Sequence, residues 1–230
     1  MSAAPLGRNL RFEVKFVTSP TRLPWIEQWV GSHAAGFFEP YPERQVNNVY
    51  FDTFDLWTYR ENLSGASSRS KVRFRWYGAA NQAERGALEV KRRVRALGWK
   101  LTYPTGAVAL EGVRWRDVQE HLRTLLPREG RLWLDEHPAA VIVNRYRRRY
   151  FESANRRIRV TVDWDQAVFD QRMRSVPNFT RAANLPDSMV VEFKFVAQDR
   201  PLASETLQTF PLRISRNSKY VIGVQAIARG

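Results

Sequence analysis

Charged side chains occupy every second position in five separate segments of this chain, and apolar side chains fill most of the positions between them. The polar positions are Arg11, Glu13 and Lys15; Lys71, Arg73 and Arg75; Glu89, Lys91 and Arg93; Arg157, Arg159, Thr161 and Asp163; and Glu192 and Lys194. An alternation with a period of two is typical of a β-strand that has one polar face and one buried face. The chain therefore has to fold around a sheet with one strongly charged face.

The wider hydrophobic pattern predicts an α+β protein with many antiparallel strands and a single domain over residues 1–230, because no repeat and no linker divides the chain. Strands are predicted at 11–17, 46–53, 70–77, 86–95, 99–103, 139–151, 156–165 and 189–196. Helices are predicted at 21–33, 54–62, 115–126, 202–210 and 218–228, with an irregular connection at 173–188.

If the strands share one sheet that curls towards closure, the charged positions line a common lumen and the apolar positions pack outward against helices. Neighbouring cations ~4–6 Å apart repel one another by several kcal/mol at intermediate dielectric, so such a tunnel predicts a polyanionic ligand. Arginine and lysine suit phosphate oxygens, and the interspersed carboxylates suit Mg²⁺ or Mn²⁺ that bridges phosphates. The alternative is an open sheet whose charged face is solvated and crossed by salt bridges between strands.

The composition agrees with an anionic ligand and argues against several other chemistries. Lys and Arg number 37 against 23 Asp and Glu, which gives a net charge of +14. The chain has no Cys, and its three His show no metal-site spacing, so a metal would be bound by oxygen. P-loop, dinucleotide-binding and nucleophile-elbow motifs do not occur. No segment is apolar enough to span a membrane, and we expect a cytoplasmic protein.

A basic sheet can also bind nucleic acid by stacking bases on aromatic side chains. The aromatic residues of these strands mostly lie on the face opposite the charges, where they indicate a core. They are Phe12, Phe16, Phe74, Trp76 and Phe193. No specific nucleic-acid partner is therefore expected. The arginines at 145 and 147–149 form either a solvated edge or a functional set.

Eight short motifs occur in the order of the VTC domain, which the chain resembles from about residue 9 to 227. They are Arg11–Phe16, Val49–Thr53, Lys71–Gly78, Leu88–Lys91, Tyr146–Phe151, Arg157–Asp163, Val191–Phe195 and Ser218–Tyr220. The VTC domain is the catalytic domain of vacuolar transporter chaperone polyphosphate polymerases and is related to the CYTH triphosphate tunnel enzymes. The resemblance implies an antiparallel β-barrel of the triphosphate tunnel type, with a charged lumen and helices packed on the outside.

The resemblance also implies an activity and a site. The activity is a metal-dependent transfer of the γ-phosphoryl of ATP onto inorganic polyphosphate, with release of ADP. Phosphate contacts are implied for Lys15, Arg73, Arg75, Lys91, Arg148, Arg159 and Lys219, with Tyr146 and Ser218 as further phosphate or nucleotide neighbours. Glu192 would hold Mn²⁺ or Mg²⁺.

We hypothesise a division of labour among these residues, since phosphoryl transfer needs alignment and charge neutralisation. The triphosphate would be held by Arg73, Arg75, Arg148 and Arg159, and the acceptor chain would be guided by Lys15, Lys91, Arg93 and Lys194. Glu13 and Glu89 are either second metal ligands or salt-bridge partners that keep cations apart.

Two features distinguish the chain from its relatives. The triphosphatases carry Glu-x-Glu-x-Lys in the first strand, whereas this chain has Arg11, Glu13 and Lys15, which favours the polymerase. The eukaryotic relatives carry an SPX domain and membrane helices; this sequence shows neither, so we expect a stand-alone form. A triphosphatase of the tunnel fold, acting on inorganic triphosphate or nucleoside triphosphates, and a non-catalytic polyphosphate-binding module are the alternatives.

Overall fold

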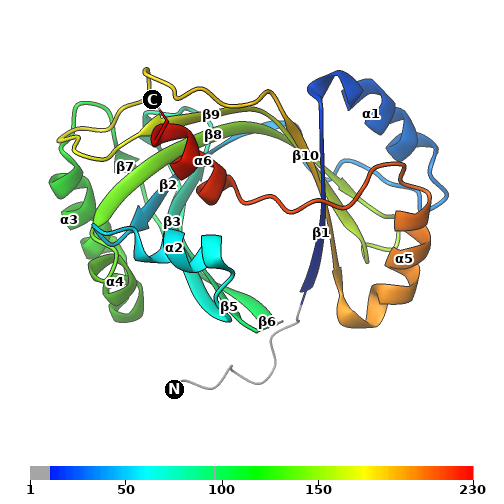
Figure 1. Ribbon diagram of the computed structural model, residues 1–230, viewed down its shortest axis with the longest axis horizontal. Coiled ribbons are helices and arrows are strands. Elements are labelled where there is room, and N and C mark those ends of the chain that lie inside the picture. The colour runs from blue at the N-terminus through cyan, green and yellow to red at the C-terminus, as the bar shows by residue number, and fades with distance from the viewer. Residues whose placement is uncertain (1–10, 96, 230) are drawn as a thin grey trace.

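The computed structural model describes residues 11–95 and 97–229 and shows an α+β fold built around one strongly curled sheet (Figure 1). Its strands are β1 (Arg11–Thr18), β2 (Arg44–Asp52), β3 (Ser68–Tyr77), β5 (Gly86–Val94), β6 (Leu97–Thr105), β8 (Ala139–Glu152), β9 (Arg159–Asp170) and β10 (Met189–Val196). They follow one another in the order β1-β10-β9-β8-β2-β3-β5-β6, and neighbouring strands are antiparallel. A small second sheet pairs β4 (Gln82–Ala83) with β7 (Val108–Ala109). The predicted antiparallel architecture is confirmed.

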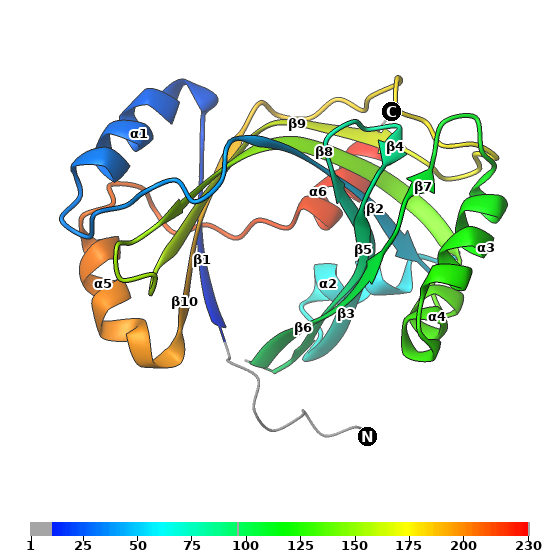
Figure 2. The same cartoon turned by 180° about the vertical axis from the view of Figure 1, so that it is seen from behind.

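The large sheet forms an arch whose edge strands, β1 and β6, face each other across an opening (Figures 1 and 2). The register shifts between Tyr50 and Phe51 in β2, and between Arg145 and Arg147 in β8. Such irregularities bend a strand and increase its twist, which helps long strands to curl. The sheet is thus a half-barrel with a concave and a convex face.

Helices cover the apolar convex face, as the sequence predicts. Helices α1 (Leu23–Ser32) and α5 (Arg200–Gln208) contribute Ile26 and Ala203 to a core that includes Phe193. Helices α3 (Trp115–Leu125) and α4 (Arg128–Asp135) cover the other half, where their core includes Phe74 and Leu88. The short 3₁₀ segments Pro20–Arg22 and Ala197–Asp199 precede α1 and α5.

Helix α4 was not expected, because Gly130 and a high charge content lower the helix propensity of this segment. Leu134 of α4 is nonetheless fully buried. A Cβ at Gly130 would lie 3.3 Å from the ring of Tyr103, so the missing side chain permits close packing. Tertiary contacts therefore outweigh the weak local preference.

Two helices lie on the concave side instead: α2 (Trp57–Ser64) and α6 (Lys219–Ile227). Tyr220 of α6 stacks on Tyr50 of β2, with the ring centroids 4.9 Å apart. A Cβ at Gly223 would come within 2.5 Å of Ile142, so α6 is seated directly on the sheet. This seat fixes the start of α6 inside the arch.

Side chains and a loop, rather than strand pairing, span the opening between the edges within the described residues. The backbone N–H of Ser215 donates to the Lys15 carbonyl at 2.7 Å, so the segment between α5 and α6 runs along the free edge of β1. Glu13 of β1 reaches Lys91 of β5, with 3.4 Å between Oε1 and Nζ. None of the helices within residues 11–95 and 97–229 has the length and apolar character that a membrane crossing demands.

Candidate functional site

The concave face encloses a cavity that collects most of the sequence-predicted cations; we call it the phosphate cavity. Its lining residues are Lys15, Tyr50, Lys71, Arg73, Arg75, Lys91, Tyr146, Arg148, Glu192, Lys194, Asn217, Ser218, Lys219 and Tyr220. Eight of these are Lys or Arg and one, Glu192, is a carboxylate. Because they come from six strands and the start of α6, the sheet must curl before the site exists.

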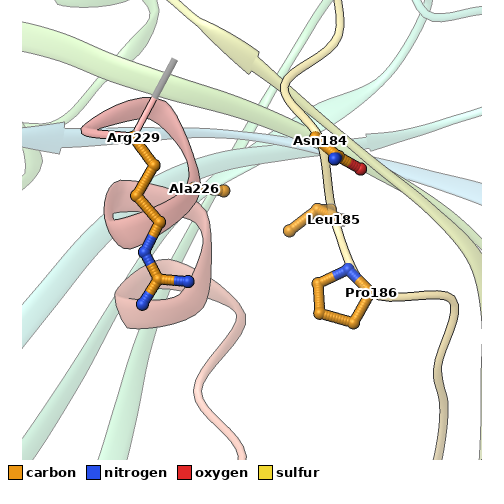
Figure 3. Close-up of a pocket in the computed structure, with 5 residues that line it drawn as sticks. All are labelled: Asn184, Leu185, Pro186, Ala226 and Arg229. Carbon is orange, nitrogen blue, oxygen red and sulfur yellow. The ribbon is translucent and has the colours of Figure 1, made fainter.

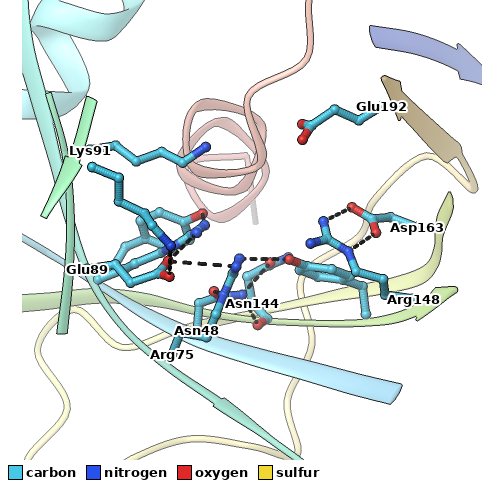
Figure 4. Close-up of polar contacts among 12 residues, drawn as sticks. Asn48, Arg75, Glu89, Lys91, Asn144, Arg148, Asp163 and Glu192 are labelled. Carbon is cyan, nitrogen blue, oxygen red and sulfur yellow. Dashed lines mark hydrogen bonds and ion pairs between the residues drawn. The ribbon is translucent and has the colours of Figure 1, made fainter. Parts of the chain in front are cut away.

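Arg73 and Arg75 are held in place on one wall by hydrogen bonds, and Figure 4 shows the surroundings of Arg75. The Nε of Arg73 donates to Glu89 at 2.8 Å, and the Nη1 of Arg73 donates to the Tyr50 hydroxyl at 3.2 Å. Arg75 donates to Asn48 Oδ1 at 2.8 Å and to the Tyr146 hydroxyl at 3.0 Å. Both guanidinium groups are therefore oriented before any ligand is bound, which reduces the entropy lost on binding.

Glu89 is a salt-bridge partner in this arrangement. Its Oε2 accepts from Arg73, and its Oε1 accepts from Lys100 of β6 at 2.6 Å. Burial raises the pKa of Glu89, but the charges of Arg73 and Arg75 outweigh burial and hold the pKa far below its usual range. The carboxylate is thus ionised, and it does not line the cavity, so it acts as a salt-bridge partner.

The opposite wall is organised around a buried aspartate, Asp163 of β9. Arg148 donates to both of its carboxylate oxygens, at 2.5 and 2.7 Å, and Lys219 of α6 donates to Oδ2 at 2.7 Å. Burial raises the pKa of Asp163, but Arg148 and Lys219 hold it well below its usual range. One aspartate therefore positions two of the cations that line the cavity.

Glu192 is the carboxylate that faces the cavity (Figure 4). Lys15 lies 3.2 Å from its Oε2, and Lys194 forms an ion pair with Oε1. Burial raises the pKa of Glu192, but Lys194 and Lys15 hold it well below its usual range, so the group is ionised. Within the described residues, no cluster of three or more His, Asp or Glu could hold a metal ion without help. Mg²⁺ is commonly bound by one or two carboxylates together with substrate phosphates, and Glu192 fits that pattern.

Three lysines lie in one row across β3, β5 and β6, because Lys71 pairs with Lys91 and Lys91 pairs with Lys100 in the strand register. Glu13 faces Lys91 and Glu89 faces Lys100. Lys71 donates instead to the Ser218 hydroxyl at 2.9 Å. Burial, reinforced by neighbouring cations such as Lys15 and Lys91, lowers the pKa of Lys71 to about 7.

Most predicted site residues meet in the cavity, but Arg93, Arg159, Glu13 and Glu89 do not line it. Arg93 is exposed and donates to the carbonyl of Arg95. Arg159 is exposed and pairs with Glu152 at 2.8 Å. Glu13 is also exposed, and it faces Lys91 as a salt-bridge partner. Alternation placed Arg157 on the charged face together with Arg159 and Asp163. In the structure Arg157 precedes β9 and pairs with Asp199 instead.

The dense arginine run of β8 divides between the two faces of the sheet. Arg148 points into the cavity. Arg147 pairs with Glu43, and Arg149 pairs with Glu39 at 2.6 Å and with Glu27 of α1. Arg145 packs over the ring of Phe169 in the convex core. Of the four arginines at 145 and 147–149, Arg148 is therefore the one that lines the cavity.

Sequence reasoning missed several members of the site. Lys71 and Asp163 stood in the alternating pattern, but no role was assigned to them. Tyr50 and Asn48 alternate with apolar residues in β2, which was a usable signal. Asn217 reaches the cavity from an irregular segment, where no periodicity could reveal it.

A larger cavity of about 400 Å³ lies elsewhere, between the end of α6 and the connection before β10 (Figure 3). It is lined by Asn184, Leu185, Pro186, Ala226 and Arg229. Among the described residues that line this second cavity, Arg229 is the one charged residue. The second cavity therefore lacks the converging charges of the phosphate cavity.

A curled antiparallel sheet with a cation-lined concave face defines a triphosphate-tunnel-type fold. The sequence matches the VTC domain model over residues 10–228, and the chain belongs to this family. The side chain of Arg11, on which the sequence-based distinction between polymerase and triphosphatase rests, lies outside the described part of the chain.

One solved structure of low sequence identity supports the same fold. A structure from Vibrio parahaemolyticus, described as a candidate adenylate cyclase, is similar with a TM-score of 0.51 and 12% sequence identity, over 93% of this chain and 97% of that chain. A protein from Pyrococcus horikoshii OT3 has a TM-score of 0.47 and 10% identity, over 92% of this chain and 96% of that chain. No curated protein matches the sequence.

Proposed function

We propose that the protein is a polyphosphate polymerase that transfers the γ-phosphoryl of ATP to the end of a growing inorganic polyphosphate chain and releases ADP. The observation that carries this proposal is the convergence of eight cations around one cavity in a member of the VTC family. Such a cavity suits two phosphate chains that meet end to end, because their combined charge is large. A cytoplasmic location, where the protein would meet ATP, is part of the proposal.

The chemistry requires no protein nucleophile. A terminal oxygen of the acceptor chain forms a new P–O bond to the γ-phosphorus, and the bond between the γ-phosphorus and the β,γ-bridging oxygen breaks. The acceptor oxygen is already ionised, and the total charge before and after transfer is the same, so no proton has to be removed. Catalysis then rests on alignment and on stabilising charge spread over phosphate oxygens.

The chain's own residues supply those two elements. Arg73, Arg75 and Arg148 are fixed by their hydrogen-bond partners and would orient the triphosphate. Lys15 and Lys194 flank Glu192 and would guide the acceptor chain beside it. Glu192 would hold Mg²⁺ or Mn²⁺ together with phosphate oxygens, and the metal would neutralise charge that develops on them.

The triphosphatase alternative needs a group that takes a proton from water. Glu192 is the carboxylate of the described cavity lining, and its pKa lies well below the usual range, which makes it a weak base. Glu192 is therefore unsuited to activating water, and the triphosphatase alternative would use Lys71 of the same lining, whose pKa burial lowers to about 7.

The test is to incubate the purified protein with ATP and Mn²⁺ or Mg²⁺ and to resolve the products by ³¹P NMR and by gel. Long phosphate chains together with ADP are expected. Orthophosphate without chains would support the triphosphatase instead. No turnover with either metal would favour a module that only binds polyphosphate.

A further inference from the structure

Three tyrosines gather around Arg44 at one end of the concave face, where β2 begins and β3 and β8 end. The guanidinium carbon of Arg44 lies 4.5 Å from the ring centroid of Tyr41, 5.6 Å from that of Tyr77 and 5.9 Å from that of Tyr150. Tyr41 and Tyr150 meet edge to face, with their centroids 5.8 Å apart. We call these four residues the tyrosine mouth.

The tyrosine mouth adjoins the phosphate cavity. Arg148 lines the cavity, and its guanidinium carbon lies 5.6 Å from the ring centroid of Tyr150. Arg44 lies directly opposite Arg148 in the pairing of β2 with β8. Tyr77 is two residues beyond Arg75 on β3. Two residues of a strand span about 7 Å, a separation that a ribose can bridge.

The opposite end of the concave face has a different character. Arg69 and Arg93 are direct partners on β3 and β5, two residues beyond the lysine pair of Lys71 and Lys91. Burial, together with the nearby charges of Arg93 and Arg216, lowers the pKa of Arg69. Converging arginines suit the oxygens of a phosphate chain, whereas a nucleobase gains more from an aromatic surface.

We infer that the tyrosine mouth binds the purine base of the nucleoside triphosphate whose phosphates occupy the phosphate cavity. The side chains of Tyr41 and Tyr77 can be reached, because these residues are 47% and 44% exposed. A base stacked on such a ring gains attraction from its π-face, and Arg44 adds a cation–π contact to the same base. The inference rests on the proposed function, because it takes a nucleoside triphosphate as the phosphoryl donor.

This assignment gives the cavity a direction. With the base at the tyrosine mouth, the γ-phosphate points inward towards Lys71 and Lys91, and the chain extends towards Arg69 and Arg93 at the far end. Donor and product would therefore use opposite ends of the concave face, and a growing chain would not block the entry of the next nucleotide.

The test compares the binding of ATP with that of inorganic tripolyphosphate by calorimetry in Tyr77→Leu and Tyr41→Leu variants. We expect ATP to bind about five- to a hundredfold more weakly, the range that corresponds to one base stacked on one aromatic ring. Tripolyphosphate, which has no base, should bind within about twofold of the unaltered protein. Tyr77→Phe keeps the ring and should retain ATP affinity.

Trp57→Leu is the matched control, because Trp57 is an aromatic residue of α2 that is 56% exposed and lies outside both the mouth and the cavity. Thermal melting of each variant checks that the fold is intact. Unchanged ATP binding in both leucine variants, or an equal loss of ATP and tripolyphosphate binding, would overturn the inference. A selective loss of ATP binding in a protein that makes no polyphosphate would uphold the base site and refute the polymerase.

Discussion

Arg148 and Asp163 face each other across β8 and β9 in a two-pronged ion pair, buried on the concave side of the sheet. The strand register places their Cα atoms opposite each other, and Lys219 completes the group from α6. The aspartate compensates two cations that would otherwise repel each other in a poorly hydrated site. Both the stability of the fold and the geometry of the cavity therefore depend on the carboxylate of Asp163.

Asp163→Asn should therefore lower the free energy of unfolding by about 3 kcal/mol or more, because the buried charges of Arg148 and Lys219 lose their counter-charge. Urea denaturation followed by tryptophan fluorescence measures this change. Glu39→Gln, which breaks an exposed pair with Arg149, is the control and should cost less than about 1 kcal/mol. Equal effects of the two substitutions would contradict the role given to Asp163.

Arg75→Ala should weaken the binding of tripolyphosphate about tenfold or more, since a charge-assisted hydrogen bond contributes roughly 1.5–3 kcal/mol. Calorimetry at fixed ionic strength is the measurement. Arg147→Ala removes the same charge from the outer face of the sheet, where Arg147 pairs with Glu43. A normal affinity in Arg75→Ala would place Arg75 outside the binding site.

Glu192→Gln should abolish metal-dependent turnover of ATP. It should also lower the melting temperature of a protein that still folds, because Lys15 and Lys194 lose a buried counter-charge. Binding of tripolyphosphate in the presence of EDTA should persist, because the cations of the cavity are retained. Glu13→Gln alters an exposed carboxylate that faces Lys91, and it should keep most of the activity. Full metal-dependent activity in Glu192→Gln would refute the metal role.

The stability of the protein should rise with pH between about pH 7 and pH 9. Burial and neighbouring cations lower the pKa of Lys71 to about 7. Burial lowers the pKa of Lys91 to about 8. For Tyr146, burial raises the pKa, but Arg148 and Arg75 outweigh it and lower the pKa to about 8.

In this pH range the unfolded chain binds more protons than the folded chain at all three positions, so raising the pH favours folding. Melting curves in a phosphate-free buffer would show the trend, and Lys71→Met should reduce its slope. A melting temperature that falls steadily over the same range would contradict this linkage.

Much of the fold could be predicted from the sequence, because its strands carry a strict two-residue period. Strand β10 was predicted with its observed bounds, and the charged and apolar faces of β3 and β5 were assigned correctly. Helix α4 could not be predicted, since its stability comes from burying Leu134 against the sheet.

The candidate site was predictable to the extent that alternation identifies which residues share a face. The alternation could not show that Arg159 and Arg93 lie outside the cavity. The curvature of the sheet decides which part of its charged face is enclosed. Nor could alternation show that Glu192 lines the cavity and Glu89 does not, since each carboxylate pairs with two cations.

The sequence by itself determined a sheet with one cationic face, because alternation is a local property of an extended chain. Only the tertiary structure decided which cations converge. The curl of eight strands and the seat of α6 at Gly223 bring Lys15, Arg148 and Lys219 together from distant parts of the chain. The physical reason is that charges separated by many residues interact only after the chain has closed around them, and that closure depends on packing.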